Sequence, residues 1–354
     1  MLTHTFIYIL TSSRAYLILQ SSLCILAKTL LYLCPAFLFA CNKDIVAPVS
    51  KEKDVVINLK SNLLENIMNS PSEKETVIDI FIYNNDKLGH LDSYQRLRTA
   101  KNEKIHVAST NGEKEIFVIV NPQWETYEWN TVSSKEGIVR LYADLRKDDE
   151  RNPLMTGSAL WKGNEDKTLD ISLRSMLSKI SIRSLKCDFS SRPYNGADLE
   201  NVYCWLANAN TLSEIGIDSF GNVLSPVNSN GYAEDIGAIR PEMLKFHIGE
   251  RIGSAGTRPG KALYCYPGCP DGCDEEEDYK TSLVISGEIH GHRYYYPITI
   301  GNIRRNCNYE FDIVITRAGS PDPLFPVQKG TAEISCRILP WEDTNESIIP
   351  FTHK

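Results

Sequence analysis

The sequence predicts an all-β protein, and three observations lead to this prediction. Apolar side chains repeat with a period of two in many short runs, as in Val77–Tyr83, where Ile78, Ile80 and Ile82 share one face. Turn-forming residues separate these runs. Only one longer stretch follows a helical period. Short alternating strands separated by turns are typical of β-sandwiches.

Seven runs carry the strand pattern. Glu115–Val120 is apolar on both faces, so we expect a central strand that is covered on both sides. The others alternate more cleanly between apolar and polar positions. The predicted strands are Val55–Leu59, Val77–Tyr83, Glu115–Val120, Leu169–Arg174, Lys179–Arg183, Tyr309–Thr316 and Glu333–Ile338.

Helices and loops fill the remaining stretches. Ile138, Leu141 and Leu145 lie at positions i, i+3 and i+7, which predicts a helix over Lys135–Lys147. Leu63–Met68 is expected to form a short helical turn. Polar residues and glycine predict loops at Asn84–Gly89, Ser158–Asp166 and Gly216–Gly231.

The first 40 residues differ from the rest of the chain. They carry two ordinary charges, Arg14 and Lys28, and are otherwise mostly apolar. The apolar run Leu30–Ala40 follows Lys28 as the core of a secretory signal follows its basic region. Leu38-Phe39-Ala40-Cys41 then resembles a bacterial lipobox, although Phe39 is bulkier than the usual residue. This resemblance implies that Cys41 is acylated and becomes the first residue of the mature chain.

A retained membrane helix is the alternative for this segment, because about 20 apolar residues span a bilayer. Pro35 and the change to charged residues after Cys41 favour cleavage. We therefore expect a signal peptide at 1–40, a lipidated linker at 41–53, and two domains at 54–175 and 176–354. A single acyl chain gives only marginal membrane binding, whereas several chains give a stable anchor.

The charge of the mature chain argues against nucleic acid as a partner. Removal of residues 1–40 takes away Arg14 and Lys28, so the net charge of −7 becomes −9. Phosphate contacts need a basic patch, and the sequence has none that stands out. We expect no nucleic-acid partner.

The cysteines after Cys41 are odd in number, so at least one is unpaired or bonded to another molecule. Cys265, Cys269 and Cys273 have C-x3-C-x3-C spacing and precede an acidic run, Asp274–Asp278. Zinc sites favour C-x2-C pairs with a distant second pair, so a local disulfide or an inert loop is the preferred interpretation. The acidic run lacks the spacing of a calcium loop and is expected at a solvated hairpin tip. The seven cysteines are Cys187, Cys204, Cys265, Cys269, Cys273, Cys307 and Cys336.

Two further patterns were considered as catalytic or binding motifs. His290 and His292 are expected on one face of a strand, but a metal would need a third ligand that the sequence does not place. Gly253–Ala262 superficially resembles a phosphate loop, but its spacing is wrong and no strand-loop-helix context surrounds it. We therefore expect no enzyme, no metal site and no cofactor.

Several segments resemble the Bacteroidetes fimbrillin superfamily, the subunits and anchors of type V pili. An apolar strand runs through an arginine into a Lys-Ile strand, and a later Tyr-Pro strand precedes an Arg-Asn turn and a closing strand that ends in Pro-Trp. The order and spacing of these segments carry the resemblance, which covers nearly the whole mature chain. The segments are Met155–Gly157, Leu169–Ile182, Tyr296–Gly301, Ile303–Ile313, Arg317–Pro323 and Pro340-Trp341.

The resemblance implies two tandem transthyretin-like β-sandwich domains after a lipoprotein signal peptide. It also implies an outer-membrane, cell-surface location in a fimbrium, and other fimbrial subunits as partners. In the family, an Arg-specific protease removes an N-terminal strand, and a strand from the next subunit fills the groove. Such donor-strand exchange works because an open sheet edge presents unpaired N–H and C=O groups.

The distribution of arginine distinguishes an anchor from a stalk subunit. Between Cys41 and Gln95 the chain has no arginine, and the first is Arg96. Arg-specific cleavage between Val55–Leu59, the strand expected to fill the groove, and the next strand therefore has no site. This favours a fimbrial anchor or accessory subunit that keeps its lipid, unless a different protease acts. The alternative is a surface lipoprotein that binds a glycan or a host or bacterial surface ligand, with Trp124, Trp129 and Tyr294–Tyr296 as stacking residues.

Overall fold

A computed structural model of the chain describes residues 53–69, 75–99, 104–163, 168–190, 193–216, 227–228, 241–267, 280–301, 303–323, 325 and 331–341. The chain divides into two compact units, Met1–Lys51 and Glu52–Lys354, and all described residues belong to the second. Among the described residues, no helix is both long enough and apolar enough to span a bilayer.

Two β-sheets enclose the first core. One has the order β4-β1-β8, and the other has the order β3-β2-β5-β7-β9. Inward-facing side chains of both sheets meet in one apolar cluster, to which the short helix α3 contributes Leu64 and Ile67. The strands are β1 (Lys53–Lys60), β4 (Ile105–Ser109), β8 (Leu169–Ser172), β3 (Leu91–Thr99), β2 (Thr76–Asn84), β5 (Lys114–Val120), β7 (Met155–Trp161) and β9 (Arg174–Ser175), with α3 at Asn62–Asn69.

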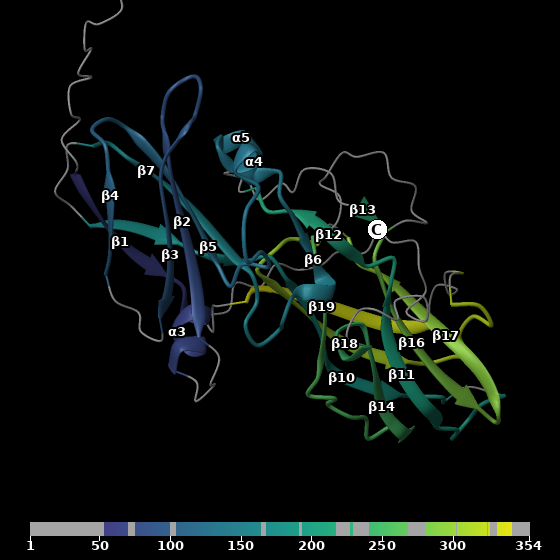
Figure 1. Cartoon of the computed structure of the whole chain (residues 1–354). Helices are drawn as coiled ribbons and strands as arrows, with labels where there is room; N and C mark the ends of the chain where they lie inside the picture. The colour runs from purple at the N-terminus through teal and green to yellow at the C-terminus, as the bar shows by residue number, and fades with distance from the viewer. Residues whose placement is uncertain are drawn as a thin grey trace, which may run out of the picture. The chain divides into compact units, whose positions relative to one another are not determined.

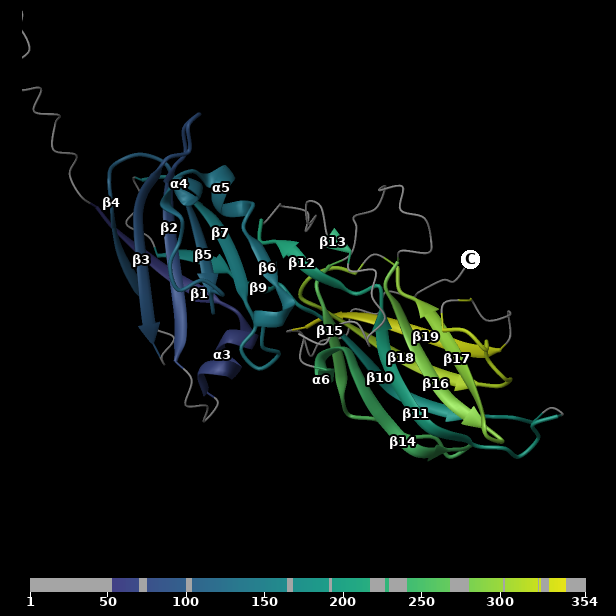
Figure 2. The same ribbon diagram turned by 45° about the vertical axis from the view of Figure 1, so that its right-hand side comes forward.

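Two further sheets enclose the second core. Their strands can be followed in Figure 1 and in the turned view of Figure 2. Their orders are β15-β10-β18-β19 and β14-β11-β16-β17. Alternating residues of both sheets form one large buried cluster. The strands are β15 (Ala262–Cys265), β10 (Ser178–Cys187), β18 (Cys307–Ile315), β19 (Ala332–Pro340), β14 (Lys245–Ile252), β11 (Leu199–Ala207), β16 (Ser282–Ile289) and β17 (His292–Thr299), and α6 (Pro241–Leu244) precedes β14.

The all-β prediction is confirmed, and most predicted strands are present. The strand predicted at Glu115–Val120 is β5, which lies between β2 and β7 and is almost wholly buried, as expected. The short helix predicted at Leu63–Met68 is α3. The assignment to the transthyretin type stays a prediction.

The helix predicted over Lys135–Lys147 is wrong. The segment instead forms a short helix, a strand that pairs with the distant β12, and a 3-10 turn. Long-range strand pairing has overridden a local helical pattern. Gly137, in the middle of α5, packs closely against α4, because an added Cβ would lie 1.7 Å from the carbonyl oxygen of Thr131. The elements are α4 (Trp129–Val132), α5 (Lys135–Val139), β6 (Tyr142–Asp144), η1 (Leu145–Lys147), β12 (Asn210–Glu214) and β13 (Val227–Asn228).

Two further expectations about strands need correction. Ser158–Trp161 belongs to β7 and not to the loop predicted at Ser158–Asp166, because pairing with β5 extends the strand past its small residues. Leu169–Arg174 is not one strand. The chain pairs with β1 as far as Ser172, then crosses to the opposite sheet at Arg174.

The boundary at 175/176 remains a proposal. In its favour, β9 ends at Ser175 in the first pair of sheets and β10 begins at Ser178 in the second pair. A small sheet, β13-β12-β6, nevertheless joins strands from both sides of this boundary. The two parts therefore share backbone hydrogen bonds as well as a covalent connection.

Candidate functional site: the seat of the first strand

Strand β1 presents a simple alternating pattern to the first core. Val55, Ile57 and Leu59 are 1%, 0% and 2% exposed, so all three point inward. Each aliphatic side chain buried in this way contributes about 1.5–3 kcal/mol relative to an exposed one. The core positions of β1 thus require three medium-sized apolar side chains spaced two residues apart.

Both edges of β1 are paired. On one edge it runs antiparallel to β4, with Lys53 opposite Ser109 and Ile57 opposite Ile105. On the other edge it runs parallel to β8, with Ile57 opposite Leu169 and Lys60 opposite Ser172. Since β1 is the middle strand of three, its removal would leave two strands with unpaired facing edges.

The outer face of β1 carries exposed polar contacts. The Lys60 ammonium lies 2.8 Å from Asp170 Oδ2, and Asn58 Nδ2 donates to Asp170 Oδ1 at 2.7 Å. Hydrogen bonds from Lys60 and Asn58 lower the pKa of Asp170. Asp54 and His106 also lie 2.6 Å apart. Exposed pairs contribute little to stability, so the apolar face and backbone pairing dominate the binding of this strand.

At its end, β1 turns directly into α3. The Ser61 hydroxyl accepts a hydrogen bond from the Leu64 N–H at 3.2 Å, which caps the helix. The Leu173 N–H donates to the Lys60 carbonyl oxygen at 3.0 Å and continues the pairing for one more residue.

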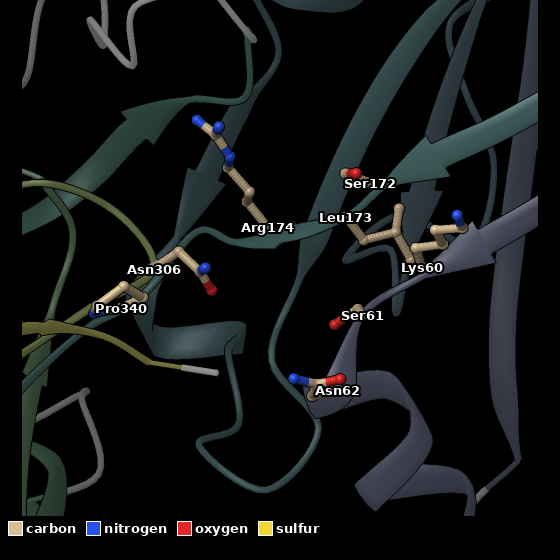
Figure 3. A pocket seen from close by; sticks show the side chains of 8 residues that line it. All are labelled: Lys60, Ser61, Asn62, Ser172, Leu173, Arg174, Asn306 and Pro340. Carbon is tan, nitrogen blue, oxygen red and sulfur yellow. The ribbon is translucent and has the colours of Figure 1, made fainter. Parts of the chain in front are cut away.

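A surface pocket of about 270 Å³ lies beside this turn. Figure 3 shows the end of β1 on one side of it and two residues of the second pair of sheets, Asn306 and Pro340, on the other. The lining is mainly polar, and among the described residues no cluster of His, Cys, Asp and Glu is suited to hold a metal ion. The remaining lining residues are Lys60, Ser61, Asn62, Ser172, Leu173 and Arg174.

Arg96, the first arginine after Cys41, is held on the face of β2 and β3 that points away from the first core. Its Nε donates to Asp79 Oδ1 and its Nη2 to Asp79 Oδ2, both at 2.6 Å, and the Asp79 side chain is fully buried. The hydroxyls of Tyr94 and Tyr127 donate to the same carboxylate at 3.0 and 2.6 Å. Burial, followed by the charge of Asp79, raises the pKa of Tyr127, which keeps it a donor.

The fold of this chain is similar to the folds of several proteins of known structure. Searches by sequence found no matching family model and no matching curated relative. A fimbrilin from Porphyromonas gingivalis W83 has a TM-score of 0.57 and 15% sequence identity, with 83% of this chain and 98% of that chain covered. The chain has the fimbrilin fold. A candidate cell adhesion protein from Parabacteroides distasonis has a TM-score of 0.60 and 12% identity, with 83% and 100% covered. A candidate cell adhesion protein from Bacteroides eggerthii has a TM-score of 0.58 and 15% identity, with 82% and 96% covered.

The aromatic residues expected to stack on a ligand differ in how exposed their rings are. Trp129 is 51% exposed at the start of α4, and its ring lies 5.1 Å from that of Tyr94. Trp124 is half-buried against Tyr127, with ring centroids 5.9 Å apart. In the fimbrilin fold of this chain, both tryptophan rings pack against the tyrosines that donate hydrogen bonds to Asp79.

The run Tyr294–Tyr296 divides between two faces, as alternation predicts. Tyr296 is 1% exposed in the second core, whereas Tyr295 packs against Trp205 on the opposite face of its sheet. Tyr294 is half-buried and shares a 3.1 Å hydrogen bond with the Tyr194 hydroxyl. The run is therefore mainly structural.

The cysteines and the acidic run singled out from sequence are only partly described by the structure. Cys41, Cys269, Cys273 and the acidic run Asp274–Asp278 lie outside the described residues. The remaining five cysteines have free thiols, and burial raises their pKa values. Thiolate, the reactive form, is thereby disfavoured at these five positions. They are Cys187, Cys204, Cys265, Cys307 and Cys336.

The placement of the two histidines on one strand face is wrong. His290 and Gly291 form the turn between β16 and β17, with φ values of 51° and 78°, and His292 begins the next strand. Positive φ at both residues is the geometry of a two-residue hairpin, which the alternating pattern on either side concealed. Gly253–Ala262 links β14 to β15, so it lacks the following helix of a phosphate loop.

The sequence analysis did not predict strand β4, which pairs with one edge of β1. Its signal was present, because Ile105 and Val107 alternate with His106 and Ala108, and both apolar residues are buried. The assignment of β4 and β8 to the two edges of β1 had no local signal. Pairing between strands 50 and 110 residues apart is set by the whole fold.

Proposed function

We propose that this protein is a structural, non-enzymatic subunit of a cell-surface fimbria, held in the outer membrane by lipid on Cys41. Within that class, it acts as an anchor or accessory subunit. The observation that carries the proposal is the position of β1: it is the fully paired middle strand of its sheet, and no arginine lies between Cys41 and Gln95, a stretch that includes the connection from β1 to β2.

Assembly by strand complementation is supported by the two-sided pairing and the buried apolar face of β1. Departure of β1 would expose the edges of β4 and β8 and the apolar side chains beneath them. An incoming strand with apolar residues at alternate positions would restore both. Other fimbrial subunits are the proposed partners, either donating such a strand or accepting one.

Retention of β1 supports an anchor over a stalk subunit. The first possible Arg-specific site is Arg96, in the middle of β3 and ion-paired to the buried Asp79. Cleavage there would require β3 to leave its sheet, since a protease needs an extended, accessible backbone. A subunit that keeps β1 also keeps its connection to the lipid on Cys41.

The N-terminus of the surface-exposed protein tests the lipid anchor. We expect palmitate labelling of wild type and loss of label in Cys41→Ala, with Cys34→Ala as a matched control within the signal peptide. Mass spectrometry of the N-terminal peptide should show acylated Cys41. A terminus beyond residue 60, or unchanged outer-membrane fractionation of Cys41→Ala, would refute the anchor.

Strand complementation is tested with the full chain. In Ile57→Asp, the buried carboxylate should displace β1, so a labelled peptide with the sequence Lys53–Lys60 should bind and raise fluorescence anisotropy. A control peptide with aspartate at the Ile57 position should not bind. Equal binding of both peptides, or of neither, would count against the exchangeable seat.

A second function, recognition of a surface ligand, is favoured by the exposed Trp129 ring beside Tyr94. Exposed aromatic rings on a rigid support are common at recognition surfaces. Glycan-array binding by wild type that is lost in Trp129→Ala, but retained in Tyr142→Ala at another exposed ring, would support this role for a glycan or a host or bacterial surface ligand.

A further inference from the structure

A buried lysine lies against an asparagine and an aspartate in the first pair of sheets. The Lys114 side chain is 1% exposed, and its Nζ lies 2.5 Å from Asn84 Oδ1 and 3.3 Å from Asp92 Oδ2. Nζ also donates to Thr110 Oγ1 at 2.7 Å. An amine, a carboxamide and a carboxylate therefore meet in one enclosed place.

Strand pairing fixes the positions of the amine and the carboxamide. Asn84 ends β2 and lies opposite Lys114, which begins β5. The two strands are neighbours in the same sheet, as Figure 1 shows. With the amide oxygen in hydrogen-bond contact with Nζ, the amide carbon is only one bond further away. Such proximity removes most of the entropic cost of a reaction between two groups.

The carboxylate is held by groups other than the lysine. Asp92 accepts hydrogen bonds from the Ser109 hydroxyl at 2.8 Å, and from the Thr110 N–H and hydroxyl at 2.9 and 2.5 Å. Burial raises the pKa of Asp92, but hydrogen bonds from Thr110 and Ser109 and the charge of Lys114 lower it more. The group is thus ionised at neutral pH, which is the form that can take a proton from the neighbouring ammonium.

We propose that Lys114 and Asn84 form an intramolecular isopeptide bond, with Asp92 as the proton acceptor. Asp92 takes a proton from the Lys114 ammonium, and the neutral Nζ attacks Cγ of Asn84. The Nζ–Cγ bond forms and the Cγ–Nδ2 bond breaks. Nδ2 takes the proton from Asp92 and leaves as ammonia, while the second proton that Nζ loses goes to water. Atoms and charge balance, and no oxidant or co-reactant is needed.

Burial distinguishes this trio from a similar one on the surface. Lys60 and Asn58 each contact Asp170 there, and the Lys60 and Asp170 side chains are 56% and 51% exposed. Water stabilises that exposed ammonium, whereas Lys114 gains its stabilisation only from its three partners. The surface trio is therefore the internal control: it should not react.

The bond would join β2 to β5 and close the chain from Asn84 to Lys114 into a loop. Strands β3 and β4 lie within that loop. Tension along the chain would then pass through the cross-link and bypass both strands. The proposal stands independently of the fimbrial role, although a subunit under tension would gain from it.

Mass spectrometry of the purified full chain tests the proposal. We expect an intact mass lower than the sequence mass by one ammonia, and a proteolytic digest containing one branched peptide that joins Asn84 to Lys114. Lys114→Arg, Asn84→Ala and Asp92→Ala should each have the full mass expected for the variant, and Asn58→Ala should retain the loss.

Two outcomes would overturn the proposal. A wild-type mass equal to the sequence mass means that the trio is only a buried ion pair. A mass lower by one ammonia that persists in Lys114→Arg means that Asn84 or another residue has cyclised on its own backbone. The wild-type measurement decides the first point even where a variant fails to fold.

Discussion

Strands β1 and β10 occupy equivalent positions in the two parts of the molecule, yet they are held differently. Each lies between an antiparallel and a parallel neighbour: β4 and β8 for β1, and β15 and β18 for β10. The parallel pairing of β10 extends from Lys179 to Cys187, whereas that of β1 covers only Ile57–Lys60.

Burial does not account for this difference. Ile180, Ile182 and Leu185 of β10 are as well buried as Val55, Ile57 and Leu59 of β1. By apolar area the two strands are bound about equally per residue. The shorter parallel pairing of β1 is the difference that supports the proposed exchange of this strand. How strongly a strand is bound and how readily it can be replaced are thus two separate properties.

The largest effect is expected from a charge placed on the inner face of each strand. Ile180→Asp should prevent folding of the second pair of sheets, because a buried carboxylate costs on the order of several kcal/mol and β10 has no substitute. Ile57→Asp should release β1 alone. Hydrogen exchange should then lose protection in β1, β4 and β8 and retain it in β10 and β18.

Val56→Asp is the matched control, since Val56 faces outward on β1 and should change little. If Ile57→Asp abolished protection in β18 as well, the two parts would unfold together and β1 would not be separately replaceable.

The sequence was sufficient where the pattern is local. Alternation at Ile78, Ile80 and Ile82, and at Tyr309, Phe311 and Ile313, predicted strands whose inward residues are indeed buried. It was insufficient where distant pairing decides. Tyr142–Asp144 became a strand only because β12 lies beside it, and the switch at Leu173 occurs where pairing with β1 ends. The sequence predicted that Val55–Leu59 forms a strand, but it did not predict which two strands pair with it.

A buried carboxyl group at the junction gives a smaller, pH-dependent effect. Asp148, from the first part, accepts a 2.8 Å hydrogen bond from the hydroxyl of Tyr266, which follows β15 in the second part. Gln123 Nε2 donates to the same hydroxyl at 3.1 Å. Burial raises the pKa of Asp148 from 3.8 to about 6, while backbone N–H groups of Leu154 and Asp149 oppose the shift.

The direction in which stability changes with pH follows from the linkage between proton binding and folding. Because the folded pKa is raised, the stability that this group contributes is fully present below its unfolded pKa and is lost as the pH rises through about 6. Asp148→Asn should therefore raise the free energy of unfolding at pH 7.5 by up to about 3 kcal/mol relative to wild type, and much less at pH 4. Urea unfolding at the two pH values measures this. An effect equal at both would show that Asp148 does not titrate in this range.

The smallest effect is expected at the polar face of β1. Lys60→Ala removes an ion pair with Asp170 in which both side chains are more than half exposed. Such exposed pairs contribute little to stability, so the unfolding midpoint in urea should move little, and less still in high salt. The rate at which β1 leaves its sheet, measured by hydrogen exchange of the β4 amides, should likewise be nearly unchanged. A marked loss of protection in β4 would show that polar contacts, and not the apolar face, hold β1 in its seat, and a replacement strand would then have to supply a lysine at this position.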